Sequence, residues 1–201
     1  LVGNNRFVYC ENRPVVGIDA DGRRTYFING INNKSDSGIP IYAEDFVKEL
    51  LDLGGKGVKA ISAYKGDGIL SGVGKVALEM VNINTYTNKL VRQIEADLKS
   101  NPLEEGEELN IIGYSGGGQL ALNVSEKLSV KPKNVVLIGA PIFEISDPNT
   151  KVSVVYAGLD PLSWTIGWGF RSLFAGWIGH TDYFAKENIE RVAKIVDSII
   201  N

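Results

Sequence analysis

Short, almost wholly apolar runs alternate with longer amphipathic segments along most of this chain. Runs without polar alternation are typical of strands that are buried on both faces of a sheet. The predicted strands are Thr25–Asn29, Val58–Ala63, Leu109–Tyr114, Asn134–Ile138 and Val152–Ala157. The predicted helices are Tyr42–Leu53, Ile83–Leu98, Gly117–Leu128 and Ala185–Ile200. Strands that alternate with helices form right-handed crossovers, so the pattern predicts a three-layer α/β fold with a mostly parallel central sheet.

Length and composition exclude several classes of protein. The chain has 201 residues, which fits one main domain, and its formal net charge is −3, which gives no indication of nucleic-acid binding. No apolar run approaches the roughly 20 residues that cross a bilayer, so stable membrane insertion is not expected. Cys10 is the only cysteine, so neither an intramolecular disulfide nor a zinc site built on cysteines can form. We expect no metal and no cofactor.

The strongest motif is Gly113-Tyr114-Ser115-Gly116-Gly117, which follows one apolar run and precedes a helical segment. In a parallel α/β sheet, ligands bind at the carboxyl ends of the strands. A serine on a sharp strand-to-helix turn presents its hydroxyl above the sheet, and the next N–H, here that of Gly116, can hold an oxyanion. Ser115 is therefore the predicted nucleophile. The alternative is a phosphate-binding turn, but no Gly-Lys-Ser/Thr follows.

His180 is the only histidine of the chain, so it is the only imidazole that could take the proton of a serine hydroxyl. It lies in a short loop before the last predicted helix. The alternative is a surface or capping histidine.

Asp160 is the predicted acid that orients His180, because it follows the carboxyl end of the strand Val152–Ala157. Asp147 is the rival, after a longer loop. Asp182 is too close to His180 in sequence to face its ring easily. Asp160-Pro161 could also be no more than a turn.

The loop Asn29–Asn33 is expected to supply the second oxyanion donor. Gly30 lets the backbone turn without a side chain. The N–H of Ile31 is the predicted donor, with Asn32 as the alternative, and a plain Asn-Gly turn remains open.

An unusually aromatic segment, Leu162–Ile178, separates the predicted acid from the predicted base. We interpret it as an apolar cap that binds an acyl chain, with an amphipathic helix packed on the core as the alternative. The predicted substrate-binding residues are Trp164, Trp168, Phe170, Phe174 and Trp177.

At Phe27–Ile31, Gly113–Gly117, Asp160 and His180 the chain resembles the α/β-hydrolase superfamily, over Thr25–Asn201. The family often has His-Gly where this chain has Asn29-Gly30. The resemblance implies a serine hydrolase, an esterase or lipase, that cleaves small-molecule esters or lipids through an acyl-enzyme intermediate. The alternatives are an acyltransferase, thioesterase or peptidase with the same three residues, or a catalytically silent binding module.

Residues 1–24 read as a separate extended segment before the catalytic domain, 25–201. Gly3-Asn4-Asn5, Glu11–Val15 and Ile18–Gly22 resemble the end of an Rhs-type repeat core, with Ala20 in place of its proline. This resemblance implies a secreted or effector module of a larger Rhs-like protein, and the start at Leu1 leads us to expect a trimmed or processed piece. Asp21-Gly22 also predicts a hairpin between residues 15–18 and 25–29.

Overall fold

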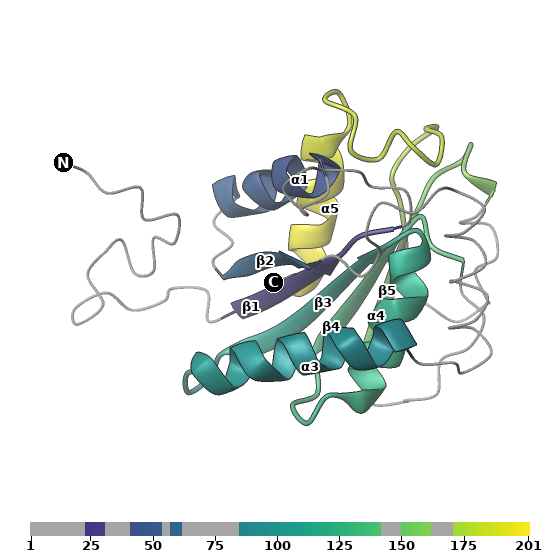
Figure 1. Ribbon diagram of the computed structural model, residues 1–201. Helices are drawn as coiled ribbons and strands as arrows, with labels where there is room; N and C mark the ends of the chain where they lie inside the picture. The colour runs from purple at the N-terminus through teal and green to yellow at the C-terminus, as the bar shows by residue number, and fades with distance from the viewer. Residues whose placement is uncertain (1–22, 31–40, 54–56, 62–84, 142–149, 162–170) are drawn as a thin grey trace.

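The computed structural model describes residues 23–30, 41–53, 57–61, 85–141, 150–161 and 171–201 (Figure 1). Strands and helices alternate along these segments. In chain order the elements are β1 (Arg23–Ile28), α1 (Ile41–Asp52), β2 (Val58–Ile61), α3 (Thr85–Ser100), β3 (Glu108–Tyr114), α4 (Gly116–Lys127), β4 (Asn134–Ile138), β5 (Lys151–Tyr156), β6 (Arg171–Phe174) and α5 (Ile189–Ile200).

The strands form one six-stranded sheet in the order β2-β1-β3-β4-β5-β6, and every neighbouring pair is parallel. In the register, Ile28 lies opposite Gly113, and Tyr114 lies opposite Ile138. The carboxyl ends of the strands therefore share one edge of the sheet, and the segment that precedes α5 lies at the same edge (Figure 1).

Helices cover both faces of the sheet, which makes three layers. α3 and α4 lie on one face and α1 and α5 on the other, and each pair is in contact (Figure 1). Each face has its own apolar cluster. Leu90 and Ile94 of α3 belong to the first cluster, and Phe46 of α1 and Val196 of α5 belong to the second. The predicted three-layer α/β architecture is confirmed.

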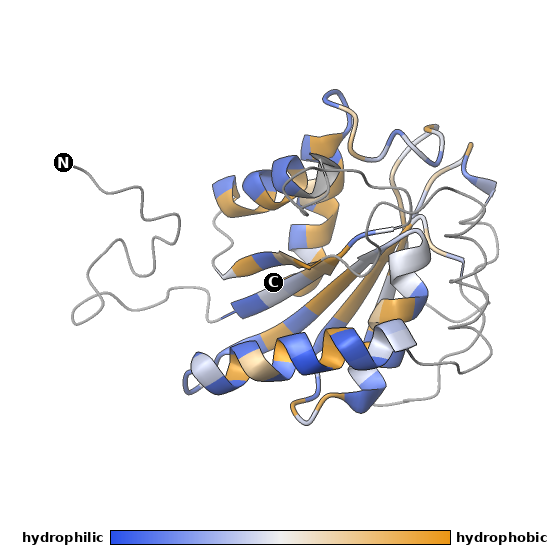
Figure 2. Ribbon diagram, in the orientation of Figure 1, coloured by the Kyte–Doolittle hydropathy of each residue, from blue (hydrophilic) through white to orange (hydrophobic). Residues whose placement is uncertain are grey.

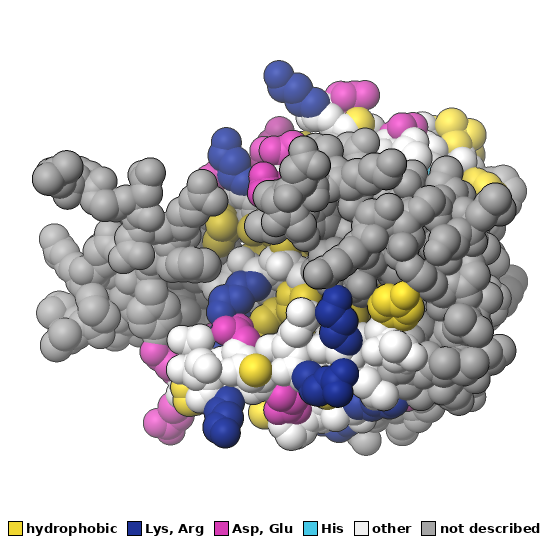
Figure 3. Space-filling model, in the orientation of Figure 1, with side chains coloured by type: hydrophobic (Ala, Val, Ile, Leu, Met, Phe, Trp, Pro, Cys, Tyr) yellow, Lys and Arg dark blue, Asp and Glu magenta, His cyan; other side chains and the backbone are white. Residues whose placement is uncertain are grey.

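The hydropathy of the elements explains these layers. The strands β3, β4 and β5 are mostly apolar, while the helices are apolar on one side only (Figure 2). In α5 the buried positions recur at helical spacing, at Ile189, Val192, Val196 and Ile199. Basic and acidic side chains alternate over the outer surface of α3, which faces solvent (Figure 3).

Two predictions of local structure were wrong, and one strand was missed. Strand β6 was not predicted, because its four residues lie in a segment read as a cap or a helix. α5 begins at Ile189 rather than Ala185, because residues 182–188 form turns closed by N–H groups onto Asp182 and Ala185 carbonyls. The hairpin onto β1 is also wrong, because β2 and β3 occupy both edges of that strand.

Within the described part of the chain, no helix is both long enough and apolar enough to cross a membrane.

Candidate active site

Ser115 stands on the turn between β3 and α4, in a backbone conformation that L-residues rarely adopt. Its φ is 53° and its ψ is −127°, and it is the only non-glycine with positive φ among the described residues. Its N–H donates to the Ile138 carbonyl at 2.9 Å, and its carbonyl accepts the Gly118 N–H at 2.9 Å. Two backbone hydrogen bonds therefore hold this strained strand-to-helix turn in place.

Two glycines allow the chain to approach this turn closely. A Cβ on Gly30 would lie 2.8 Å from the Ser115 Cβ and 3.3 Å from its Oγ. A Cβ on Gly117 would overlap the carbonyl oxygens of Ile28 and Asn29. The end of β1 consequently packs directly against the serine and against the first turn of α4.

The imidazole of His180 lies between Ser115 and Asp160. Its Nε2 is 2.8 Å from the Ser115 Oγ, and its Nδ1 is 3.0 Å from the Asp160 Oδ1. Asp160 is fully buried, Ser115 is 7% exposed, and the His180 side chain is 23% exposed. With a proton on Nδ1, Nε2 is free to accept the serine proton, so the arrangement can generate an alkoxide nucleophile.

Strand β6 explains how residues 20 positions apart in sequence meet. The pairing of β5 with β6 continues past both strands, through an isolated bridge between Leu159 and Gly179. The Leu159 N–H also donates to the Ile178 carbonyl at 3.3 Å. Asp160 and His180 each follow one of the two bridged residues, so the extended pairing sets them side by side.

Two tyrosines and a glycine surround the Asp160–His180 pair. The Tyr183 hydroxyl donates to the Asp160 Oδ2 at 2.9 Å. The Tyr114 ring stacks on His180, with centroids 5.5 Å apart, and its hydroxyl donates to the His180 carbonyl at 2.7 Å. Gly139, with φ 52°, leaves room for both Tyr183 and Asp160. Our reading of the sequence missed these residues, and nothing in the local pattern marks them.

The other predicted or rival residues fall into two groups, those that the structure describes and those that lie outside the described residues. Gly116 begins α4, where backbone N–H groups have no acceptor within the helix. The Asp182 carboxylate accepts the Gly179 N–H at 3.1 Å and the Thr181 hydroxyl at 3.1 Å, so it stabilises its own loop. Six predicted or rival residues lie outside the described part of the chain: Ile31, Asn32, Asp147, Trp164, Trp168 and Phe170.

Phe174 and Trp177 lie on an exposed apolar patch near Asp160 and His180. Phe174 ends β6 and is 44% exposed, Trp177 is 74% exposed, and Leu159, which precedes Asp160, is 60% exposed. The rings of Phe174 and Trp177 meet edge to face at 5.7 Å, and Tyr156 packs on Phe174 at 5.3 Å. We define these residues, Tyr156, Leu159, Phe174 and Trp177, as the aromatic patch.

Among the described residues, no group of three or more histidine, cysteine or carboxylate side chains could hold a metal ion.

The architecture matches solved structures of hydrolases. A dienelactone hydrolase-like promiscuous phosphotriesterase, P91, from metagenomic libraries superposes with a TM-score of 0.60 at 15% identity, over 89% of this chain and 85% of that chain. Esterase PE8 gives 0.56 at 13% identity, over 90% and 94%. A candidate hydrolase of the α/β superfamily from Xanthomonas campestris pv. campestris gives 0.53 at 13%, over 87% and 98%. No protein-family model and no curated protein matches the sequence. The chain has the α/β-hydrolase fold.

Proposed function

We propose that this protein is a serine hydrolase that cleaves carboxylic esters through an acyl-enzyme intermediate. The observation that carries the proposal is the continuous hydrogen-bonded line from the buried Asp160 through His180 to Ser115, at the carboxyl edge of the sheet. A serine, an imidazole and a carboxylate in this order are the groups that nucleophilic acyl transfer needs.

In the first half of the reaction, the Ser115 Oγ attacks the ester carbonyl carbon while Nε2 of His180 takes the hydroxyl proton. The carbonyl oxygen becomes an oxyanion, which the N–H groups of Gly116 and Ile31 hold. The imidazolium then gives its proton to the leaving alcohol as the C–O bond breaks. Asp160 keeps the Nδ1–H tautomer in place and stabilises the imidazolium.

In the second half, His180 takes a proton from water, and the resulting hydroxide attacks the acyl group on Ser115. The tetrahedral intermediate expels the serine, which regains its proton from His180. The products are a carboxylic acid and an alcohol, and the three side chains return to their starting state without a metal or cofactor.

The aromatic patch supports an apolar acyl group as the part of the substrate that lies beside the triad. Leu159 directly precedes Asp160 and is bridged to Gly179, which precedes His180. We therefore expect the substituents of an ester bound at Ser115 to reach this patch. Exposed apolar contacts of this kind are typical of ligand-binding and interaction surfaces. Trp164, Trp168 and Phe170 are proposed to extend the same surface.

The experiment compares Ser115→Ala with Ser125→Ala on p-nitrophenyl esters. Ser125 lies on α4, the helix that follows Ser115. It is buried and donates to the Leu122 carbonyl, so it is a matched serine outside the site. We expect Ser115→Ala to lower kcat by more than ~10³-fold and to abolish labelling by a fluorophosphonate, with both retained in Ser125→Ala. Equal turnover by the two variants would place the nucleophile elsewhere.

Product analysis with competing alcohols or amines tests the reaction type. Release of free acid as the main product supports hydrolysis, whereas dominant transfer of the acyl group to the added alcohol or amine identifies an acyltransferase. A native protein that neither turns over esters nor reacts with the fluorophosphonate is a silent binding module.

A further inference from the structure

The buried carboxylate of Asp160 has a second hydrogen bond that the proposed reaction does not use directly. Its Oδ1 faces His180 Nδ1 at 3.0 Å, and its Oδ2 accepts the Tyr183 hydroxyl at 2.9 Å. Both Asp160 and Tyr183 are 0% exposed. A charged carboxylate without contact to water depends on such donors for its stability, and two donors on different oxygens also fix the plane of the group.

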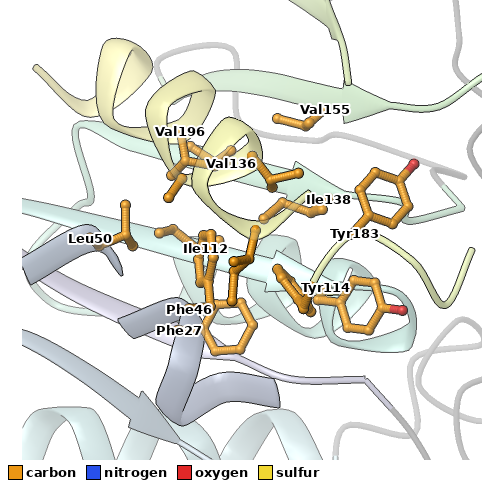
Figure 4. Close-up of a cluster of buried hydrophobic side chains, with 14 of the residues drawn as sticks. Phe27, Phe46, Leu50, Ile112, Tyr114, Val136, Ile138, Val155, Tyr183 and Val196 are labelled. Atoms are coloured by element: carbon orange, nitrogen blue, oxygen red, sulfur yellow. The ribbon is translucent and has the colours of Figure 1, made fainter. Parts of the chain in front are cut away.

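Tyr183 is itself held firmly. It lies in the turn of residues 182–188, where the Ala185 N–H and the Asn188 side-chain amide both donate to the Asp182 carbonyl, at 3.1 Å and 2.9 Å. Its ring packs edge-on against Tyr114, with centroids 6.1 Å apart. Both rings lie at one end of the apolar cluster and direct their hydroxyls out of it (Figure 4).

The backbone opposite Tyr183 leaves no spare room. Gly139, directly after β4, has φ 52°, and a Cβ there would lie 2.7 Å from the Tyr183 Cε2 and 2.8 Å from the Asp160 Oδ2. The phenol and the carboxylate therefore both lie against the end of β4, where any residue with a Cβ would overlap them.

We propose that Tyr183 is a positioning residue, whose hydroxyl holds the Asp160 carboxylate so that Oδ1 faces Nδ1 of His180 and selects the Nδ1–H tautomer. This inference rests on the proposed function for its kinetic consequence, but not for its structural one. Tyr183 acts through Asp160 and touches neither the substrate nor the serine.

The chain offers a matched control for this hydrogen bond. Tyr26 is also a buried tyrosine, 1% exposed, whose hydroxyl donates to an aspartate, Asp97 Oδ2, at 2.6 Å. This second pair lies between β1 and α3. Tyr26→Phe therefore removes the same type of hydrogen bond from another buried tyrosine, away from His180.

The experiment measures the ring ¹⁵N resonances of His180 and the kinetics of p-nitrophenyl ester hydrolysis in the wild type, Tyr183→Phe and Tyr26→Phe. His180 is the only histidine, so ring-labelled protein gives a single pair of resonances. At about pH 8, where an ordinary imidazole is neutral, their shifts report the tautomer populations. We expect Tyr183→Phe to lower the Nδ1–H population and to lower kcat about 5- to 30-fold with KM little changed. Tyr26→Phe should leave both readouts at wild-type values.

Wild-type ¹⁵N shifts and kcat in Tyr183→Phe would overturn the proposal, as would equal changes in the two variants, which would assign the effect to packing alone. If Tyr183→Phe does not fold, 3-fluorotyrosine at position 183 keeps the ring and makes the hydroxyl more acidic. A shifted Nδ1–H resonance then supports the proposal, and an unchanged one overturns it. A tautomer change in a protein without Ser115-dependent turnover would refute the hydrolase proposal and leave the positioning role standing.

Discussion

A tyrosine hydroxyl meets an aspartate at two places in this molecule, and the two pairs differ in what else the carboxylate binds. Asp97 on α3 accepts Tyr26 and also the Lys59 ammonium, at 2.7 Å and 2.8 Å, and its side chain is 24% exposed. Asp160, which is fully buried, accepts Tyr183 and the imidazole of His180.

The pKa shifts of Asp97 and Tyr26 are typical of a pair that stabilises the fold. Burial pushes the pKa of Asp97 upward, but the hydrogen bonds from Lys59 and Tyr26 outweigh it and hold the pKa below its usual value. Burial, and then the hydrogen bond to Asp97, raises the pKa of the Tyr26 phenol. The charge on Asp97 is thus balanced locally by a cation. In the reaction that we propose, the partner of the Asp160 carboxylate is instead the imidazole of His180, which becomes charged only during turnover.

Removing the two carboxylate charges in turn tests whether Asp97 and Asp160 differ in role, and it has the largest expected effect. We expect Asp160→Asn to lower kcat on p-nitrophenyl esters by about 10³- to 10⁴-fold, because an amide no longer holds the Nδ1–H tautomer or stabilises the imidazolium. Asp97→Asn should leave kcat within about twofold and lower the free energy of unfolding by about 1 kcal/mol or less, because Lys59 loses its charged partner. Steady-state kinetics and urea unfolding of both variants measure these effects. Similar losses of kcat would show that the two carboxylates do not differ in role.

Gly139→Ala and Gly106→Ala test the packing around the Asp160 carboxylate, because the two glycines lie at opposite ends of the sheet. Both glycines have positive φ, 52° and 86°, but a Cβ on Gly139 meets Tyr183 and Asp160 whereas one on Gly106 meets nothing within 4 Å. We expect Gly106→Ala to cost about 1–2 kcal/mol of unfolding free energy and to leave kcat unchanged.

Gly139→Ala adds the cost of overpacking, for a total of about 3 kcal/mol, and should lower kcat at least about tenfold because Asp160 is displaced. Urea unfolding and kcat for the two variants separate the conformational penalty from the displacement. Matching losses of kcat would contradict the tight packing that we describe around the carboxylate.

The sequence could predict the features that depend on one segment alone. The strands β1, β3, β4 and β5 are five to seven residues long and almost wholly buried, and each contains a short apolar stretch that can be recognised without any neighbour. The serine turn is also local, because its glycines and its serine are adjacent in the chain. These features depend on sequence patterns within one segment.

β6 and Tyr183 depend on distant partners, and for that reason they could not be predicted. β6 has only four residues, and it is a strand because β5 offers it a free edge. Tyr183 reads as an ordinary aromatic in a turn, and only the position of Asp160, 23 residues away, gives its hydroxyl a partner. His180 could be chosen from the sequence because it is the only histidine of the chain. The tyrosines that surround it and Asp160 could not be predicted.

The aromatic patch allows a finer test at the carboxyl edge, with Leu159→Ser against Val130→Ser. Leu159 is 60% exposed beside Asp160, and Val130 is 40% exposed in the loop after α4. If the patch binds the acyl group, Leu159→Ser should raise KM for p-nitrophenyl octanoate about 3- to 10-fold and leave KM for the acetate unchanged. Val130→Ser should change neither value, since it lies away from the site. Equal effects on octanoate and acetate would place the acyl chain elsewhere.

The smallest expected effect concerns the pH dependence of stability through Asp97. Its pKa in the folded chain is lowered below the ordinary value of about 3.9, so between the two values the unfolded chain binds more protons than the folded one. The stabilisation is therefore complete above about pH 5 and is lost as the pH falls through about 4 and below.

Because the pair is partly exposed and screened by water, we expect about 1 kcal/mol or less from this term. Urea unfolding between about pH 3 and 6 should show a steeper acid loss in the wild type than in Asp97→Asn, which cannot titrate. Tyr26→Phe should fall between them, since it removes one of the hydrogen bonds that lower the pKa while Lys59 remains. If the unfolding free energy of Asp97→Asn falls with pH as steeply as that of the wild type, other carboxylates dominate acid unfolding. The pairing of Asp97 with Lys59 and Tyr26 would then add little to the stability of the fold.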